Sequence, residues 1–143
     1  MTSFSKVCFF FEHRNFSLEN RTLLKKFIES IFRREKRKID SLNYVFVSDK
    51  RLLEINHQFL GHDYYTDIIT FDISEGSSIK GEVYISIDRL KENSKKLGVS
   101  FKSELHRVIF HGALHLCGFK DNTTTERKKM RAREDFYLFG YFK

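Results

Sequence analysis

The sequence predicts an α+β fold in which a mixed sheet of about four strands packs against about five helices, with a metal site on a central helix. Three observations lead to this prediction. Short apolar runs typical of strands occur at four places in the 143 residues. Segments with apolar residues at helical spacing lie between them and after the last of them. No proline, linker or repeat interrupts the chain, so residues 1–143 are expected to form one domain.

The first half of the chain alternates between strands and helices. Val7–Phe11 is an apolar run suited to a buried strand, and Leu42–Val47 is predicted to lie parallel to it through a right-handed crossover. Ser17 is predicted to cap the helix between these strands. A second helix is predicted over Arg51–Leu60. Its apolar residues are expected to face inward: Leu52, Leu53, Ile55 and Phe59.

The middle of the chain has the pattern of a hairpin followed by a helix. Ile68–Ile73 is a predicted strand, and the loop EGSSIKG separates it from the clean alternation over Glu82–Asp88. Because this loop is short, the two strands are expected to be antiparallel. A helix over Ile87–Leu97 should follow and end at Gly98.

The last two predicted helices differ in character. Ser100 is expected to cap a helix that runs to Cys117, and this helix is apolar nearly all round, which predicts a central place in the fold. Thr123 and Glu126 fit a capping box at the start of a strongly charged final helix.

The charge balance favours an anionic partner. Lys and Arg number 26 against 19 Asp and Glu, giving a formal charge of +7, which suits RNA, DNA or an acidic membrane surface. The apolar runs are far shorter than a membrane span, and the N-terminal segment lacks the features of a secretion signal. Two cysteines are too few for a disulfide framework. We therefore expect a cytoplasmic protein.

The stretch HGALHLCGFKD has the spacing of a metal site. On a helix, His111 and His115 place both imidazoles on one face, one turn apart. Gly118 favours an exit from the helix through a left-handed turn, which brings Asp121 within reach of the same point. This spacing can supply three ligands and leave one coordination position open, as a catalytic metal requires. Structural roles for the two histidines are the alternative, but burial among apolar neighbours would be costly without polar partners.

Three functions are compatible with such a site. A divalent ion can lower the pKa of a bound water to roughly 7 and polarise a phosphoryl or carbonyl oxygen, so a nuclease and a metallopeptidase or other amide hydrolase are both candidates. Zinc proteases carry a glutamate after the first histidine, where this chain has Gly112, which argues against peptide hydrolysis by that route. A structural metal usually needs four protein ligands, and only three are apparent.

Several further residues are candidates for supporting roles. Glu104, seven residues before His111, could orient a metal ligand, or it could be an exposed carboxylate that complements the helix dipole. Basic residues near the end of the first helix and on the last helix are candidates for binding RNA phosphates, although solvated helix surfaces explain them as well. These residues are Arg34, Arg37, Lys128 and Arg131.

The same motif is similar to the signature H-G-x-L-H-L-x-G-Y-D-H of the YbeY-type endoribonucleases, which mature bacterial ribosomal RNA. Two other segments also resemble this family: Asn56 with TDIITFD (Thr66–Asp72), and GEVYISID (Gly81–Asp88). The order of elements agrees along nearly the whole chain. The resemblance implies a cytosolic, metal-dependent, single-strand-specific endoribonuclease that acts in small-subunit (16S) rRNA maturation and ribosome quality control. Its implied partners are ribosomal RNA and the small ribosomal subunit, with no membrane and no organic cofactor.

Carried over by position, the resemblance implies that one divalent ion, with zinc as the first candidate, is bound by His111, His115 and Asp121. The third histidine of the signature aligns with Asp121, and a set of two imidazoles and one carboxylate suits zinc, iron and other divalent ions. An arginine of the family aligns with Leu60. If that arginine grips phosphate in relatives, another cation must do so here.

Overall fold

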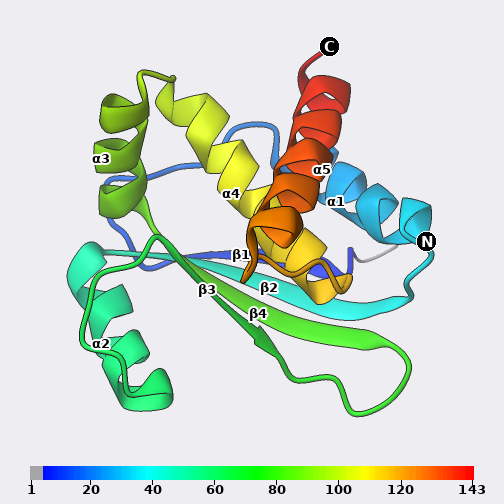
Figure 1. Ribbon diagram of the computed structural model, residues 1–143, viewed down its shortest axis with the longest axis horizontal. Coiled ribbons are helices and arrows are strands. Elements are labelled where there is room, and N and C mark those ends of the chain that lie inside the picture. Colours follow the sequence, from blue (N-terminus) through cyan, green and yellow to red (C-terminus); the bar gives the residue numbers. More distant parts are fainter. Residues whose placement is uncertain (1–4) are drawn as a thin grey trace.

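The predicted α+β class is confirmed by a computed structural model that describes residues 5–143. A four-stranded sheet carries helices on both of its faces in this part of the chain (Figure 1). The elements are, in chain order, β1 (Val7–Phe11), α1 (Arg21–Arg34), β2 (Ile39–Val47), α2 (Asp49–Leu60), β3 (Ile68–Asp72), β4 (Ile79–Ser86), α3 (Ile87–Leu97), α4 (Phe101–Leu116) and α5 (Thr124–Phe142).

The sheet is mixed, with strand order β1-β2-β4-β3. β1, β2 and β4 are parallel to their neighbours, and β3 runs antiparallel to β4, so both the predicted crossover and the predicted hairpin are confirmed. β4 begins earlier than expected, inside the predicted loop, because Ile79 is buried and its N–H donates to the carbonyl of Lys38. β3 is an edge strand, and it borders the cavity that contains His111, His115 and Asp121.

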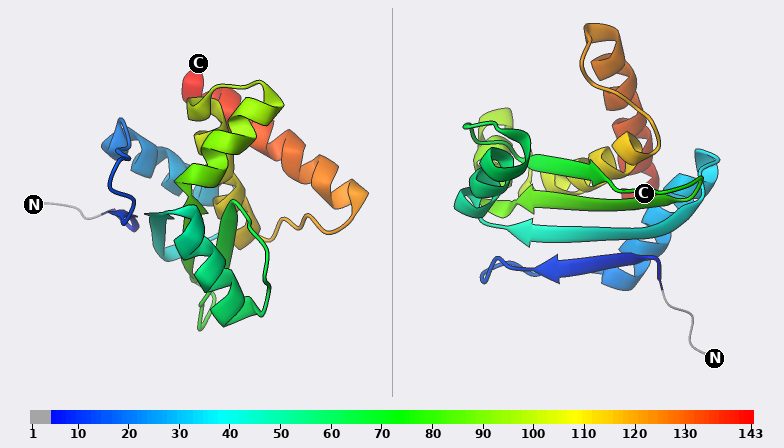
Figure 2. Two further views of the ribbon diagram at one scale, coloured as in Figure 1. Left: turned by 90° about the vertical axis from the view of Figure 1, so that its left-hand side faces the viewer. Right: turned by 90° about the horizontal axis from the view of Figure 1, so that it is seen from below.

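Two apolar cores lie on opposite faces of the sheet. The larger one packs α1, α4 and α5 against the sheet, and α2 covers a smaller one on the other face (Figures 1 and 2). Most residues of α4 are buried, and the Tyr44 hydroxyl on β2 donates to the Ile109 carbonyl at 2.8 Å. The predicted central position of this helix is therefore confirmed.

The helix ends follow the predicted chemistry in most places. The Ser100 and Thr123 side chains accept hydrogen bonds from backbone N–H groups, and Thr123 forms the expected capping box with Glu126. Gly98 ends α3 with a left-handed backbone (φ 69°). No helix within residues 5–143 is both long enough and apolar enough to cross a membrane.

Two local predictions were wrong. Ser17 does not cap α1, which begins four residues later, after the left-handed Asn20 (φ 54°). The buried side chain of Leu18 keeps the preceding segment in an irregular path over the core. Phe59 was expected to face inward but is 61% exposed, because it packs edge-on against Phe71 of the edge strand β3 and leaves most of its ring in solvent.

Candidate metal centre

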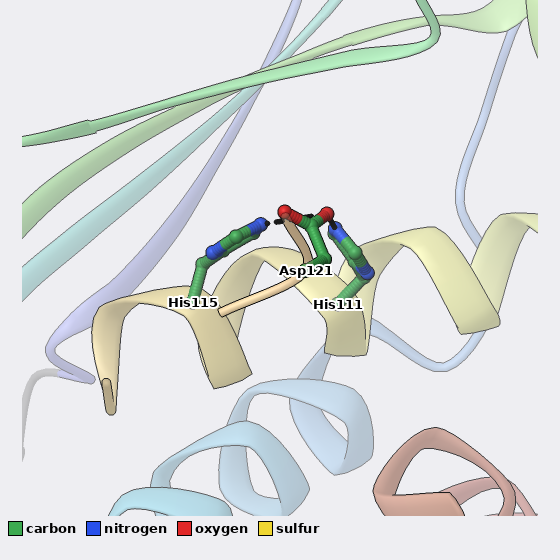
Figure 3. A group of neighbouring side chains, drawn as sticks. All are labelled: His111, His115 and Asp121. Atoms are coloured by element: carbon green, nitrogen blue, oxygen red, sulfur yellow. Dashed lines mark hydrogen bonds and ion pairs between the residues drawn. The ribbon is translucent and has the colours of Figure 1, made fainter. Parts of the chain in front are cut away.

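The three predicted ligands converge. His111 and His115 point from the same face of α4, and Asp121 meets them from the segment between α4 and α5 (Figure 3). One carboxylate oxygen, Asp121 Oδ2, lies 3.2 Å from His115 Nε2 and 3.3 Å from His111 Nε2. The three candidate ligand atoms all lie within 4.8 Å of one another.

The turn after α4 explains this convergence. Cys117 caps the helix, and Gly118 follows with φ 107°, a conformation that disfavours any side chain with a Cβ. The Gly118 N–H donates to the His115 carbonyl at 3.0 Å, and Arg37 holds the free Cys117 carbonyl at 2.7 Å. The chain therefore turns back toward the helix instead of leaving it, and Asp121 reaches the imidazoles.

Two of the three distances between these atoms suit a tetrahedral ion. For metal–ligand bonds of roughly 2.0–2.1 Å, neighbouring ligand atoms of a tetrahedron are about 3.3–3.4 Å apart. The distances from Asp121 Oδ2 to the two imidazole nitrogens, 3.2 and 3.3 Å, match this edge. Within residues 5–143, no fourth His, Cys, Asp or Glu joins the group. Such a trio can hold a divalent ion and leave one position for water or substrate, which is the arrangement of a catalytic rather than a structural site.

A second carboxylate, which the sequence prediction missed, contacts the site from α5. Glu134 Oε2 lies 2.6 Å from His111 Nδ1, and Arg107 donates to Glu134 Oε1 at 2.9 Å. A signal for this residue was present: Glu134 lies four residues after Met130 and three before Tyr137, both buried on the inner face of α5. A carboxylate on such a stripe requires a polar partner.

The partner of His111 is thus not Glu104, the predicted candidate. Glu104 lies two turns before His111, and side chains on a helix lean toward its N-terminus, so this carboxylate is directed away from the imidazole. Glu104 is not an exposed dipole partner either, because it is only 6% exposed and lines the cavity beside the site. It makes no side-chain hydrogen bond or ion pair within the described residues. Burial, followed by the charge of Asp67, raises the pKa of Glu104.

The ionisation of the site reflects these contacts. Burial disfavours the charged form of His111, but the hydrogen bond and charge of Glu134, with the charges of Asp121 and Asp67, outweigh it and raise the pKa of His111. Burial also raises the pKa of Asp67 at the start of β3. Both shifts favour proton binding in the metal-free cluster, so protons and a bound cation would compete for it.

The three ligands border an open cavity of about 590 Å³. Its walls are the edge strand β3 with the segment just before it, the face of α4 that carries the two histidines, and the middle of α5. A neighbouring cavity of about 460 Å³ shares His111 and Asp121 with the first and is lined by Arg127, Lys128 and Arg131. Each cavity has the size of a small-ligand site, and together they can take a short polymer segment.

The four predicted RNA-binding cations divide into two groups. Arg131 and Lys128 line the cavity beside the ligands, and neither side chain makes a hydrogen bond or an ion pair with residues 5–143. Arg34 instead lies over the ring of Phe136 at 5.3 Å, and Arg37 supports the turn after α4. The structure therefore brings only the α5 pair to the candidate site.

The profile of the family described as Endoribonuclease YbeY matches residues 10–141 of the chain. The chain belongs to this family. Endoribonuclease YbeY of Cytophaga hutchinsonii is 49% identical over 133 residues, which cover 92% of this chain and 93% of that protein. Endoribonuclease YbeY of Porphyromonas gingivalis is 39% identical over 92% of this chain and 87% of its own length. A solution structure of a Thermotoga maritima protein is similar in fold, with a TM-score of 0.67 and 26% identity, over 95% of this chain and 89% of that one.

Two positions show how this YbeY-family chain is adapted around the site. A Cβ on Gly112 would lie 3.0 Å from Val83 and 3.2 Å from Ile68, so the glutamate of zinc proteases would have to enter the interface between α4 and the sheet. Leu60, which the resemblance aligns with an arginine of the family, ends α2 and is 44% exposed. No cation at this position can therefore contribute to binding phosphate.

Proposed function

We propose that the protein is a metal-dependent endoribonuclease that cleaves single-stranded RNA, with one divalent ion, zinc as the first candidate, held by His111, His115 and Asp121. The observation that carries the proposal is the convergence of these three side chains beside an open cavity in a chain of the endoribonuclease YbeY family. The tight packing of Gly112 against Val83 and Ile68 disfavours a protease glutamate at this position, which supports a nuclease over a peptidase.

The ion would act as a Lewis acid on a phosphoryl oxygen and lower the pKa of a coordinated water to roughly 7. The chain itself supplies the charges that hold the substrate. Arg131 and Lys128 lie beside His111 and Asp121 without an acidic partner among the described residues, so they are available to RNA phosphates. Arg107 is not available in the same way, because Glu134 and Asp135 both pair with it.

We further propose that the RNA is ribosomal RNA of the small subunit (16S), and that the protein acts in the cytoplasm in rRNA maturation and ribosome quality control. Residues 1–143 would act as one domain in this role. The support is the resemblance to the family and the positive charge of +7, which favours association with ribosomal RNA. Trimming of precursor rRNA in isolated small subunits by the purified protein is the corresponding test, and precursor ends that stay unchanged would contradict this assignment.

The nuclease activity is tested with a labelled single-stranded oligoribonucleotide and its duplex. The zinc-loaded protein should cleave the single strand, lose activity with a chelator and regain it when zinc is restored. His115→Ala should be inactive, whereas His57→Ala, an exposed histidine on α2, should cleave like the wild type. Cleavage by the metal-free protein at the same rate would contradict the proposal, and turnover of a peptide without cleavage of RNA would favour the metallopeptidase.

A further inference from the structure

The two histidines of the candidate centre have unequal surroundings. His111 uses both ring nitrogens: Nε2 lies 3.3 Å from Asp121 Oδ2, and Nδ1 lies 2.6 Å from Glu134 Oε2. His115 uses only Nε2, at 3.2 Å from the same Asp121 oxygen. Its Nδ1 makes no hydrogen bond with residues 5–143. His111 therefore has a second contact that fixes its ring, and His115 lacks one among the described residues.

The carboxylate behind His111 is itself fixed. The Glu134 side chain is 7% exposed, and Arg107 of α4 binds its other oxygen at 2.9 Å. The second guanidinium nitrogen of Arg107 binds Asp135 at 2.6 Å, which limits rotation of the arginine. Each Glu134 oxygen thus has its own partner on α4, one imidazole and one guanidinium. This is the fully satisfied state that a buried carboxylate requires.

The contact determines which nitrogen of His111 can bind an ion. Glu134 has no proton to donate when ionised, so the 2.6 Å contact requires a hydrogen on His111 Nδ1. In the neutral imidazole, this leaves the lone pair on Nε2, the nitrogen that points at Asp121. A carboxylate in this position also increases the basicity of the imidazole and prevents the ring from rotating.

We propose that Glu134 is a positioning residue that holds His111 in the tautomer and orientation needed to bind the divalent ion, and that it thereby couples ion binding to the docking of α5 on α4. This inference rests on the metal site of the proposed function. Glu134 is not one of the three ligands of the ion; it acts through His111. Because it belongs to α5, tighter packing of that helix strengthens the site, and the bound ion strengthens the packing by the same factor.

The test uses the full chain with Glu134→Gln, and Asp135→Asn as a matched control that removes the negative charge of an Arg107 partner without touching His111. Zinc affinity is measured by competition with a chromogenic chelator. Glu134→Gln should bind zinc about 10–100-fold more weakly than the wild type, the usual loss when such an outer partner is removed. Asp135→Asn should retain the wild-type affinity.

A second readout separates positioning from a general loss of structure. In ¹⁵N NMR spectra of the metal-free protein, His111 of the wild type should be the Nδ1–H tautomer at pH values where it is neutral, and His115 should favour the Nε2–H tautomer, because its Nε2 contacts Asp121. Glu134→Gln should move His111 toward a mixture and leave His115 unchanged. Zinc should slow amide hydrogen exchange along α5 in the wild type and do so less in the variant. If Glu134→Gln does not fold, Glu134→Asp keeps the charge but withdraws the carboxylate from His111, and the same measurements apply.

The outcomes distinguish the two proposals. If the wild type binds zinc, and Glu134→Gln binds it with the same affinity and gives the same His111 spectra, only the inference is overturned. A wild-type protein that binds no divalent ion would overturn the proposed function and the inference together.

Discussion

His111 and His115 are equivalent in the sequence but not in the molecule. Both project from one face of α4, and both touch the same Asp121 oxygen. The His111 side chain is 19% exposed, is supported by Glu134 of α5 and borders both cavities. His115 is 30% exposed, has no such support among the described residues and borders only the larger cavity. Of two ligands separated by one helical turn, only His111 thus has a supporting contact from another helix, α5.

Replacing either histidine by alanine sharpens this comparison most. Both changes should lower RNA cleavage by more than about 100-fold, beyond the loss expected for an outer partner. Only His111→Ala also leaves the Glu134 carboxylate buried with an unused oxygen, so its free energy of unfolding without metal should fall about 1–3 kcal/mol further than that of His115→Ala. Urea unfolding of the two metal-free variants measures the difference, and equal stabilities would show that Glu134 is not committed to His111.

The ion pair behind His111 should matter next for stability. Arg107→Leu removes the cation that pairs with the buried Glu134 carboxylate and leaves it only the contact with His111; breaking a buried ion pair by removing one partner typically costs about 3–5 kcal/mol of unfolding free energy. Adding Glu134→Gln to Arg107→Leu should recover much of this loss, because the uncompensated charge is then gone. Chemical denaturation of the two variants and the double variant forms a double-mutant cycle. Independent, additive effects would contradict a direct pairing of these residues.

The cations near His111, Lys128 and Arg131, allow the proposed binding of RNA to be tested. Arg131→Ala should weaken binding of a single-stranded oligoribonucleotide and reduce the slope of log affinity against log salt by about one. Arg34→Ala is the matched control, since Arg34 lies over Phe136 on another surface, and it should change the slope less. Fluorescence anisotropy with a chelator present measures both. A larger effect of Arg34 would place the RNA path elsewhere.

The smallest effect is expected at Glu104, at the end of the cavity remote from His115. Burial and Asp67 raise its pKa in the folded state, with Arg107 and Arg131 acting in the opposite direction and Glu134 adding to the increase. A raised acid pKa means that the folded state binds the proton more tightly, so stability is lost as the pH rises through the unfolded and then the folded pKa. Glu104→Gln should therefore be more stable than the wild type near pH 8.

This advantage should disappear below about pH 3, where the wild-type carboxyl is protonated in both states. Thermal unfolding of the metal-free proteins across this range measures it. A constant difference between the two proteins at all pH values would show that the ionisation of Glu104 does not differ between the folded and unfolded states.

Local sequence patterns were sufficient for the part of the site that is local. The four-residue spacing of His111 and His115, the turn at Gly118 and the reach of Asp121 all depend on eleven consecutive residues, and the structure brings these side chains together as predicted. The same holds for the capping box at Thr123, which needs only neighbouring residues. The spacing of apolar residues likewise predicted most helices and strands, because burial of one face of an element determines that spacing.

The tertiary part of the site could not be predicted in this way. Glu134 follows His111 by 23 residues, and only the packing of α5 on α4 brings the two together. The sequence shows that Glu134 lies on a buried stripe, but it does not show which partner it meets. The wrong orientation of Phe59 has a related cause, because periodicity predicts a side of the helix without showing whether the sheet extends far enough to cover it.

The most direct test of the central claim is X-ray absorption spectroscopy of the metal-loaded protein, with the metal content measured on the same sample. We predict one divalent ion per chain, bound by two imidazole nitrogens and a carboxylate oxygen at roughly 2.0–2.1 Å with one further light-atom ligand, and no ion in His115→Ala. A protein that binds no stoichiometric ion, or one whose ion lacks imidazole ligands, would contradict the account.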